Sequence, residues 1–380
     1  MKRTLVLAFV ILTTWQARSQ SNNNSTGWIS CQITPGEVLI PVTINDHAAT
    51  ARLLNGSNSS IDKDFIDKNN IPSESSASGQ PKTAALTLQV GNLTVNQVVN
   101  ATVFAHQKRI IPYDLFLGEE IFKEFIVDVD FPNQRIAFHR PGSFIPPGGV
   151  TPLAFKPSGR EGYRAAALSI EEGPSMLYWV FLGDPAPISV YENYFAGHAM
   201  LQGRAHSIRM GGGPRNPPEA IATVREVSFA GTTFSQVPGV FPDDSVTGDH
   251  PAEVAGHIGQ GILSRCRVIF DYGDDQVYVI PGSKTVVKAP FAKDRSGLTV
   301  KQINDSYVVR YVCPGSPAMK AGFQVGDIIV QVNNQPLPAF IGAAWQLAAW
   351  NRVQWTDTGA TYSIMLKDGT VRKLTTAEFF

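Results

Sequence analysis

The feature of this sequence that most constrains its fold is an internal repeat. Residues 117–131 (LGEEIFKEFIVDVDF) align without a gap with residues 258–272 (IGQGILSRCRVIFDY). Apolar residues coincide at most positions, and both copies continue through a turn into an alternating segment, at 135–139 and 276–280. Alternation with a period of two indicates a strand. The chain therefore contains two copies of one structural unit, 141 residues apart.

A shorter pair of matching blocks precedes the two copies. Residues 53–57 (LLNGS) precede the first copy and residues 180–185 (VFLGDP) precede the second, with their glycines aligned. The chain also contains 33 glycines and 26 prolines, which favours many turns between short strands. Each half is thus predicted as a strand, a glycine turn, further strands, an apolar segment ending in glycine, and a hairpin. We predict two duplicated β lobes, at 28–150 and 151–284.

The last part of the chain has a different pattern. A Gly-Ser-Pro-Ala turn at 315–318 leads into a short helix, and Gly326 and Asp327 open an apolar strand. This pattern strongly resembles a PDZ domain of the bacterial protease type. The resemblance implies a domain at 285–380 that binds an extended peptide along the edge of its sheet.

Four short motifs in the repeated halves point to one family. Asn55–Ser57 and Leu182–Pro185 correspond to glycine loops, and Leu115–Gly118 and Gly256–Gly259 correspond to apolar segments that end in glycine. With these motifs the chain resembles the retropepsin-like and pepsin-like aspartic proteases, specifically exported bacterial aspartyl proteases that carry a PDZ domain. The resemblance implies a mostly β fold with two duplicated β-barrel lobes, in which each apolar segment threads behind a loop.

The catalytic positions of that family are occupied by apolar residues in this chain. Aspartic protease chemistry needs two facing carboxylates, one ionised to activate water and the other protonated. By the resemblance, each aspartate directly precedes the Thr or Leu of its loop. Leu54 and Phe181 occupy these positions, although the loop glycines Gly56 and Gly183 are retained. The sequence therefore predicts that no catalytic residue is present.

Three other acidic residues lie near the loops. Asp184 belongs to a Gly-Asp-Pro sequence, in which a short polar side chain is expected to cap a turn. Asp62 and Asp64 follow the first loop and are expected at a helix start or on a solvated face. A general acid or base typically contributes roughly a hundred- to ten-thousandfold to a rate. Loss of both aspartates thus predicts negligible hydrolysis.

Gly297, Leu298, Thr299 and Val300 are the candidate peptide-binding residues of the PDZ-like domain. We expect the amide-bearing loop and the edge strand here, with the amides holding a terminal carboxylate. Leu298 and Val300 either line the apolar pocket, with a helix around 343–350 as its other wall, or face inward as core residues. Alternation alone does not distinguish the two faces. The implied partner is a peptide or a protein C-terminus.

The N-terminus predicts export. Met1–Arg3 is basic, residues 4–15 are mostly apolar, and small residues precede a cleavage position after Ser19, so residues 1–19 are predicted to be a signal peptide. The apolar run is shorter than the roughly 20 residues that span a bilayer. We therefore expect a periplasmic or secreted protein without a membrane span, beginning with a flexible segment at 20–27.

Composition excludes several other classes of function. Lys and Arg together number 32, as do Asp and Glu, so no net charge attracts nucleic acid or an anionic membrane. Three cysteines are too few for a disulfide framework, and Cys266, within an apolar run, is expected to be a buried thiol. His250 and His257 near Asp249 lack the spacing of metal ligands on a helix. We predict neither a metal nor a cofactor.

Three functions stay open from the sequence. The first is a catalytically inactive aspartyl-protease-like protein that binds extended peptides through its cleft, its PDZ groove or both. The second is an active aspartic endopeptidase that uses acids elsewhere in the chain. The third is a non-enzymatic scaffold whose function is PDZ-mediated assembly.

Overall fold

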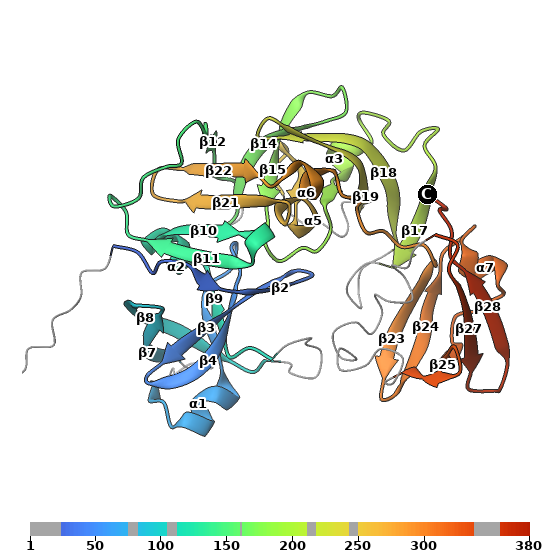
Figure 1. The fold of residues 1–380 in the computed structure, drawn as a ribbon, viewed down its shortest axis with the longest axis horizontal. Helices are drawn as coiled ribbons and strands as arrows, with labels where there is room; N and C mark the ends of the chain where they lie inside the picture. Colours follow the sequence, from blue (N-terminus) through green and yellow to red (C-terminus); the bar gives the residue numbers. More distant parts are fainter. Residues whose placement is uncertain are drawn as a thin grey trace, which may run out of the picture.

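The computed structural model describes residues 24–74, 83–104, 112–159, 162–210, 218–242, 250–337 and 358–380. These residues form a mostly β structure, in which two lobes share a central sheet and a smaller domain follows (Figure 1). The fold class predicted from the repeat is thereby confirmed. The predicted signal peptide and the helix expected around 343–350 lie outside the described residues.

The first lobe is a six-stranded barrel. Its strands follow the order β3-β4-β9-β5-β8-β7, and β3 pairs again with β7 to close the ring. Alternate residues face the interior, as in β8, where Leu93, Val95 and Val99 are buried. The elements of this lobe are β2 (Gln32–Thr34), β3 (Glu37–Ile44), β4 (His47–Leu53), β5 (Ser60–Asp62), α1 (Lys63–Asn69), β6 (Ser73–Glu74), β7 (Thr83–Val90), β8 (Leu93–Thr102), β9 (Leu115–Leu117) and α2 (Glu119–Glu124).

The second lobe repeats the first strand for strand. Its ring has the order β14-β15-β20-β16-β19-β18, and β14 pairs with β18 to close it. Parallel pairs occur at the same places, β4 with β9 and β15 with β20. The elements are β13 (Lys156–Pro157), β14 (Arg164–Ile170), β15 (Ser175–Val180), β16 (Ile188–Val190), α3 (Glu192–Phe195), β17 (His206–Met210), β18 (Pro218–Phe229), β19 (Thr232–Phe241), β20 (Val254–Ile258) and α5 (Gln260–Leu263). The duplicated sequence thus folds into a duplicated structure.

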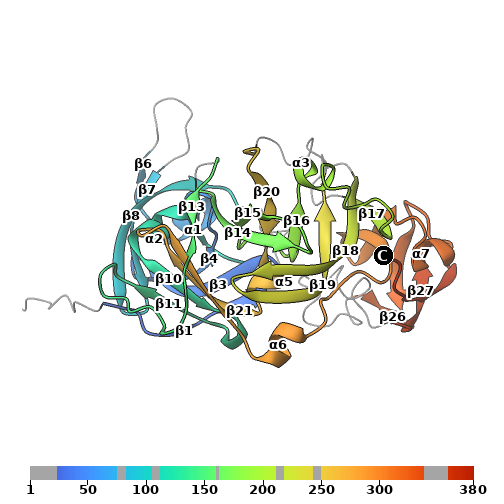
Figure 2. The same ribbon diagram turned by 90° about the horizontal axis from the view of Figure 1, so that it is seen from above.

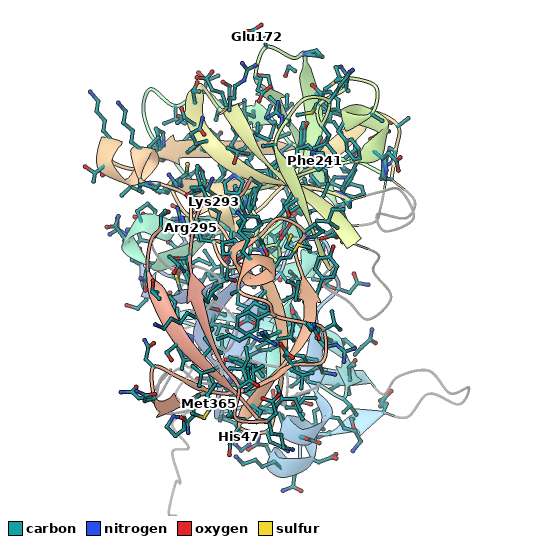
Figure 3. All side chains as sticks on the ribbon, turned by 90° about the vertical axis from the view of Figure 1, so that its right-hand side faces the viewer. His47, Glu172, Phe241, Lys293, Arg295 and Met365 are labelled. Carbon is teal, nitrogen blue, oxygen red and sulfur yellow. The ribbon has the colours of Figure 1, made fainter. Side chains whose placement is uncertain are left out.

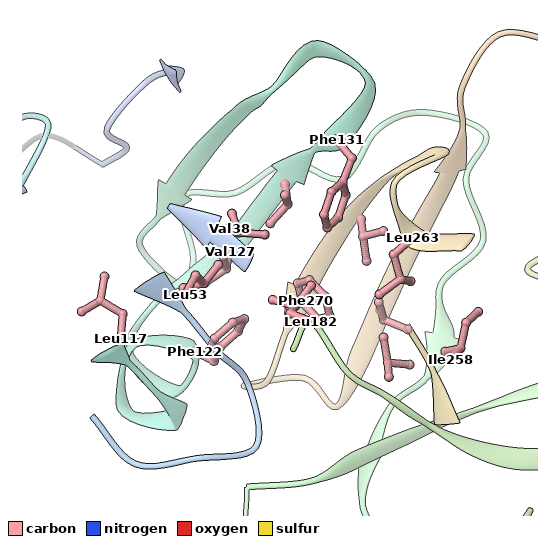
Figure 4. Packing of buried hydrophobic residues seen from close by; sticks show 14 of the residues in the cluster. Val38, Leu53, Leu117, Phe122, Val127, Phe131, Leu182, Ile258, Leu263 and Phe270 are labelled. Carbon is pink, nitrogen blue, oxygen red and sulfur yellow. The ribbon is translucent and has the colours of Figure 1, made fainter. Parts of the chain in front are cut away.

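A central sheet joins the two lobes. Its order is β1-β11-β10-β21-β22-β12, and the two long repeats meet in its middle, where Val129 of β10 lies opposite Val268 of β21. Figure 4 shows Leu53 of the first lobe and Leu182 of the second in the same hydrophobic cluster. The elements are β1 (Ile29–Ser30), β10 (Ile126–Asp130), η2 (Phe131–Asn133), β11 (Arg135–His139), β12 (Leu153–Ala154), β21 (Cys266–Asp271) and β22 (Gln276–Pro281). The lobes therefore share one core.

The cysteines belong to packed interiors. All three are buried, and none forms a disulfide. Cys266 lies in β21 at 1% exposure, and burial raises the pKa of its thiol to about 12. The expectation of a buried thiol is confirmed. No helix within the described ranges is long and apolar enough to cross a membrane.

The C-terminal domain has a sheet and a core of its own. Its strands follow the order β23-β24-β25-β27-β28 (Figure 1), with β26 beside β25. Helix α7 starts after Ser316, whose hydroxyl accepts the Met319 N–H at 3.3 Å, and has Pro317 at its first position, as helix starts favour. The elements are α6 (Lys284–Lys288), which precedes the domain, β23 (Leu298–Ile303), β24 (Ser306–Val312), α7 (Pro317–Lys320), β25 (Ile328–Val332), β26 (Gln335–Pro336), β27 (Thr361–Leu366) and β28 (Val371–Thr375).

The C-terminal domain lies beside β17 and β18 of the second lobe, far from β7 and β8 of the first (Figures 1 and 2). Lys293, in the connecting segment, donates to the Thr223 hydroxyl of β18 at 3.5 Å. Both Lys293 and Arg295 form ion pairs with Glu378, at 2.5 and 2.8 Å, and Figure 3 shows the two cations where lobe and domain meet. The chain's C-terminal segment is thus tied to the connection between lobe and domain.

Candidate functional site

The first glycine loop follows β4 and is held from behind by the segment that ends β9. The Leu54 N–H donates to the Leu117 carbonyl at 3.0 Å, and the Glu119 N–H donates to the Ser57 carbonyl at 2.8 Å. A Cβ on Gly118 would lie 2.1 Å from the Ser57 carbonyl oxygen. Only glycine lets the two segments approach this closely.

The second loop is built in the same way. The Phe181 N–H donates to the Ile258 carbonyl at 2.9 Å, and the Gln260 N–H donates to the Asp184 carbonyl at 2.8 Å. A Cβ on Gly259 would lie 2.5 Å from the Asp184 carbonyl oxygen. The threading expected from the resemblance is therefore present in both lobes.

The two loops meet at the lobe interface. The amide side chain of Asn55, at 1% exposure, donates to the Val180 carbonyl at 2.6 Å and accepts the Leu182 N–H at 2.9 Å. A Cβ on Gly183 would lie 2.6 Å from Cδ1 of Leu54, so the side chain of the first loop packs directly on the second. One buried amide thus bridges the lobes beside the expected catalytic positions.

Apolar side chains occupy the places where the resemblance expects the two aspartates. Leu54 packs toward Gly183, and the Phe181 ring stacks on Tyr163 with centroids 5.7 Å apart and planes at 20°. Tyr163 also covers Gly56, since a Cβ there would lie 3.2 Å from its ring. Gly56 has a φ of +84°, a left-handed conformation that suits glycine.

The nearby acidic residues have the structural roles predicted for them. Asp184 caps its turn by accepting the Ala186 N–H at 2.8 Å. Asp62 is the N-cap of α1 and accepts the Asp64 N–H at 3.4 Å, and it also accepts the Phe104 N–H at 3.2 Å. Each of these carboxylates is therefore engaged within its own lobe.

A pocket of about 260 Å³ opens beside the second loop. Its lining residues are Tyr163, Trp179, Phe181, Gly183, Asp184, Tyr191 and His257. The Trp179 ring lies 4.7 Å from Tyr163 and 5.9 Å from Tyr191, between centroids. The pocket walls are thus mainly aromatic.

One polar chain runs along the pocket. His257 bonds through Nδ1 to the Tyr191 hydroxyl at 2.9 Å, and through Nε2 to the Asp184 carboxylate. Sequence reasoning considered His257 only as a metal ligand; within the described residues no group of three or more metal-binding side chains occurs. Alignment of the repeats places His257 opposite Phe116, so the repeat gave no signal for a polar role at this position.

The candidate peptide-binding segment lies at the start of β23. In the part of the C-terminal sheet that the structure describes, β23 is an edge strand. Leu298 is fully buried in the core of the domain, and Val300 packs against the same cluster. Of the two placements considered from the sequence, the core placement holds for Leu298. Thr299 pairs with Tyr311 of β24.

The amides of this segment already donate within the chain. The Gly297 N–H lies 3.0 and 3.1 Å from the two oxygens of the Asp294 carboxylate. The Leu298 N–H donates to the Ser296 hydroxyl at 3.1 Å. Gly297 has a φ of +75°, and a Cβ there would lie 2.1 Å from the Ser316 side chain, so glycine is required at this position.

Comparison with known proteins gives a family match and a similar solved structure. The family model of the PDZ domain matches residues 308–344. A solved structure, the crystal structure of aspartic proteinase from Irpex lacteus, is 12% identical, with a TM-score of 0.45, and the match covers 70% of this chain and 100% of that chain. No curated protein matches the chain by sequence. The chain thus combines two closed six-stranded β barrels, duplicated around a shared sheet, with a C-terminal domain that the PDZ model matches at 308–344.

Proposed function

We propose that this protein is an exported, catalytically inactive aspartic-protease-like protein that binds extended peptide segments without cleaving them. The observation that carries the proposal is the pair Leu54 and Phe181 at the starts of the two loops, packed against Gly183 and Tyr163. Neither side chain can take a proton from water or donate one to a peptide carbonyl. The usual acid–base contribution of both groups is then missing.

The pocket beside the second loop supports peptide binding by the cleft. Ligand pockets for drug-sized molecules are about 300 to 1,000 Å³, so a pocket of about 260 Å³ suits one side chain of a longer ligand. Its aromatic walls favour an apolar or aromatic side chain, because ring stacking adds to the burial of apolar area. The Asp184–His257 pair supplies a polar end to the pocket.

The first experiment tests inactivity. The mature chain is incubated at acidic and neutral pH with fluorescently labelled casein, with and without pepstatin, beside an active aspartic protease. We expect no release of labelled fragments by the wild-type chain. Release that pepstatin inhibits would refute the proposal and favour the active-endopeptidase alternative.

A pair of double variants tests whether acids alone are missing. Leu54→Asp with Phe181→Asp restores both carboxylates, and Leu54→Asn with Phe181→Asn introduces polarity of similar size without charge. We expect casein cleavage above background only from the aspartate pair. No rise in cleavage from a folded aspartate pair would count against an intact substrate groove.

A second experiment tests binding. Fluorescence anisotropy of labelled casein peptides with the full chain is expected to show saturable binding that Phe181→Ala weakens severalfold. Ile145→Ala is the matched control, because Ile145 is 86% exposed. Equal binding by both variants and wild type would remove the cleft from the binding site and favour the PDZ scaffold alternative.

A further inference from the structure

The loop at 294–297 of the PDZ domain holds an anion supplied by the chain itself. Asp294 accepts the Ser296 N–H at 2.8 Å, the Ser296 hydroxyl at 2.9 Å and the Gly297 N–H at 3.0 Å. These donors lie on successive residues of the loop that leads into the edge strand. The PDZ resemblance implies that amides of this loop hold the terminal carboxylate of a peptide, and Asp294 already accepts from two of them.

The loop cannot easily turn these amides toward a ligand. Ser296 is fully buried, and its carbonyl accepts the Ala318 N–H of α7 at 2.9 Å. The Gly297 carbonyl accepts the Cys313 N–H at 2.8 Å. Contacts on both sides thus fix the loop while Asp294 occupies its donors.

A second carboxylate at this loop is disfavoured for two reasons. Each backbone amide has a single hydrogen, so a ligand carboxylate would have to displace Asp294 from amides that it already satisfies. The two like charges would then stand within a few ångströms of each other, where their repulsion is strong. The nearby Arg295 guanidinium is paired with the Glu378 carboxylate at 2.8 Å.

The strand that follows the loop is suited to a ligand without a terminal charge. In the sheet order, β23 pairs with β24 on one side and forms the edge on the other, as far as the structure describes the sheet. Main-chain hydrogen bonds along such an edge hold an extended segment regardless of where its chain ends. Ile303, at the end of β23, is 47% exposed and offers an apolar contact to it.

We propose that Asp294 excludes a terminal carboxylate, so that the PDZ domain binds internal, extended segments of unfolded chains and not protein C-termini. The inference rests on the proposed function in one respect, that the domain binds peptides. It narrows the partner expected from the sequence, a peptide or a protein C-terminus, to a segment within a chain.

The test compares chain ends on the full-length protein. Ten-residue segments of casein are each synthesised as a free acid, as a C-terminal amide, and embedded in a longer peptide. Binding is measured by anisotropy, and binding at the PDZ edge is identified by slower hydrogen exchange of β23. We expect the three forms of each segment to bind within about threefold of one another. Free acids that bind tenfold tighter than their amides would overturn the inference but leave the proposed function standing.

Two variants assign the effect to Asp294. Asp294→Ala opens the loop amides and is expected to bind free acids severalfold tighter than amides. Asp294→Asn keeps an acceptor oxygen but removes the charge, and it is also expected to bind free acids more tightly than amides. It tests the inference if the alanine variant does not fold. Asp305→Ala, in an exposed turn, is the control and is expected to show no preference. No preference in either Asp294 variant would overturn the inference, and no binding of any form by wild type would refute it together with the PDZ part of the proposed function.

Discussion

Asn55→Ala is expected to weaken the association of the two lobes. In the native chain the Asn55 side chain satisfies the Val180 carbonyl at 2.6 Å and the Leu182 N–H at 2.9 Å, both at a buried interface. Alanine fills neither role, and a buried backbone group left without a partner costs about 1–3 kcal/mol. The two groups together predict a loss of about 2–6 kcal/mol in the free energy of unfolding.

Thermal unfolding measures this loss. Because the lobes share one core, we expect them to unfold together, and about 1 kcal/mol shifts Tm by about 2–4 °C in units of this size. A loss of about 4 kcal/mol then lowers Tm by about 8 °C or more. Asn58→Ala, in an exposed position of the same loop, is the matched control and is expected to change Tm by less than about 2 °C. If Asn55→Ala and Asn58→Ala have the same Tm, the amide bridge does not stabilise the association of the lobes.

Two further predictions concern packing and pH. Gly118→Ala is expected to abolish folding or to lower Tm strongly, because its Cβ would lie 2.1 Å from the Ser57 carbonyl oxygen. Gly148→Ala is the control. Open space surrounds Gly148, so its Tm is expected to stay within about 2 °C of the wild-type value. Burial raises the pKa of Glu171, but its bonds to Arg204 and Arg225 outweigh burial and hold the pKa at about 2. Since the folded-state pKa is depressed, this stabilisation is present above the unfolded value near 4.5 and is lost as pH falls toward 2. Glu171→Gln should therefore flatten the fall of Tm between pH 4.5 and 2, and an unchanged slope would contradict the assignment.

The repeat in the sequence predicted the architecture because strand pairing depends on patterns that the chain carries locally. The alternating and apolar segments at 126–130 and 266–271 fixed two strands that meet in the central sheet. The passage of the Gly118 and Gly259 segments behind the loops was expected from the family resemblance, and the structure shows why glycine is needed there, because a Cβ would collide with main chain. The repeat predicted the two β lobes, and the resemblance implied the barrels and the loops.

Contacts between distant positions could not be predicted in the same way. The amide bridge joins Asn55 to main-chain atoms of the other lobe, and main-chain partners leave no trace in residue identity. The bonds of His257 to Tyr191 and Asp184 depend on which face of β20 points outward, which a short apolar segment does not reveal. The same holds for Leu298, because alternation predicted its strand but not which face of the strand is buried.

The preserved loops do not by themselves support a working groove. Asn55 and Leu54 bridge and pack the lobes, so the first loop contributes to stability whether or not a peptide ever binds. Retention of the loop glycines therefore follows from folding alone. The aromatic pocket does not follow from folding in the same way. An open cavity of about 260 Å³ lacks the van der Waals contacts that side chains filling it would make. Peptide binding is inferred from the open pocket beside the second loop, and the cleft experiment with Phe181→Ala addresses that feature directly.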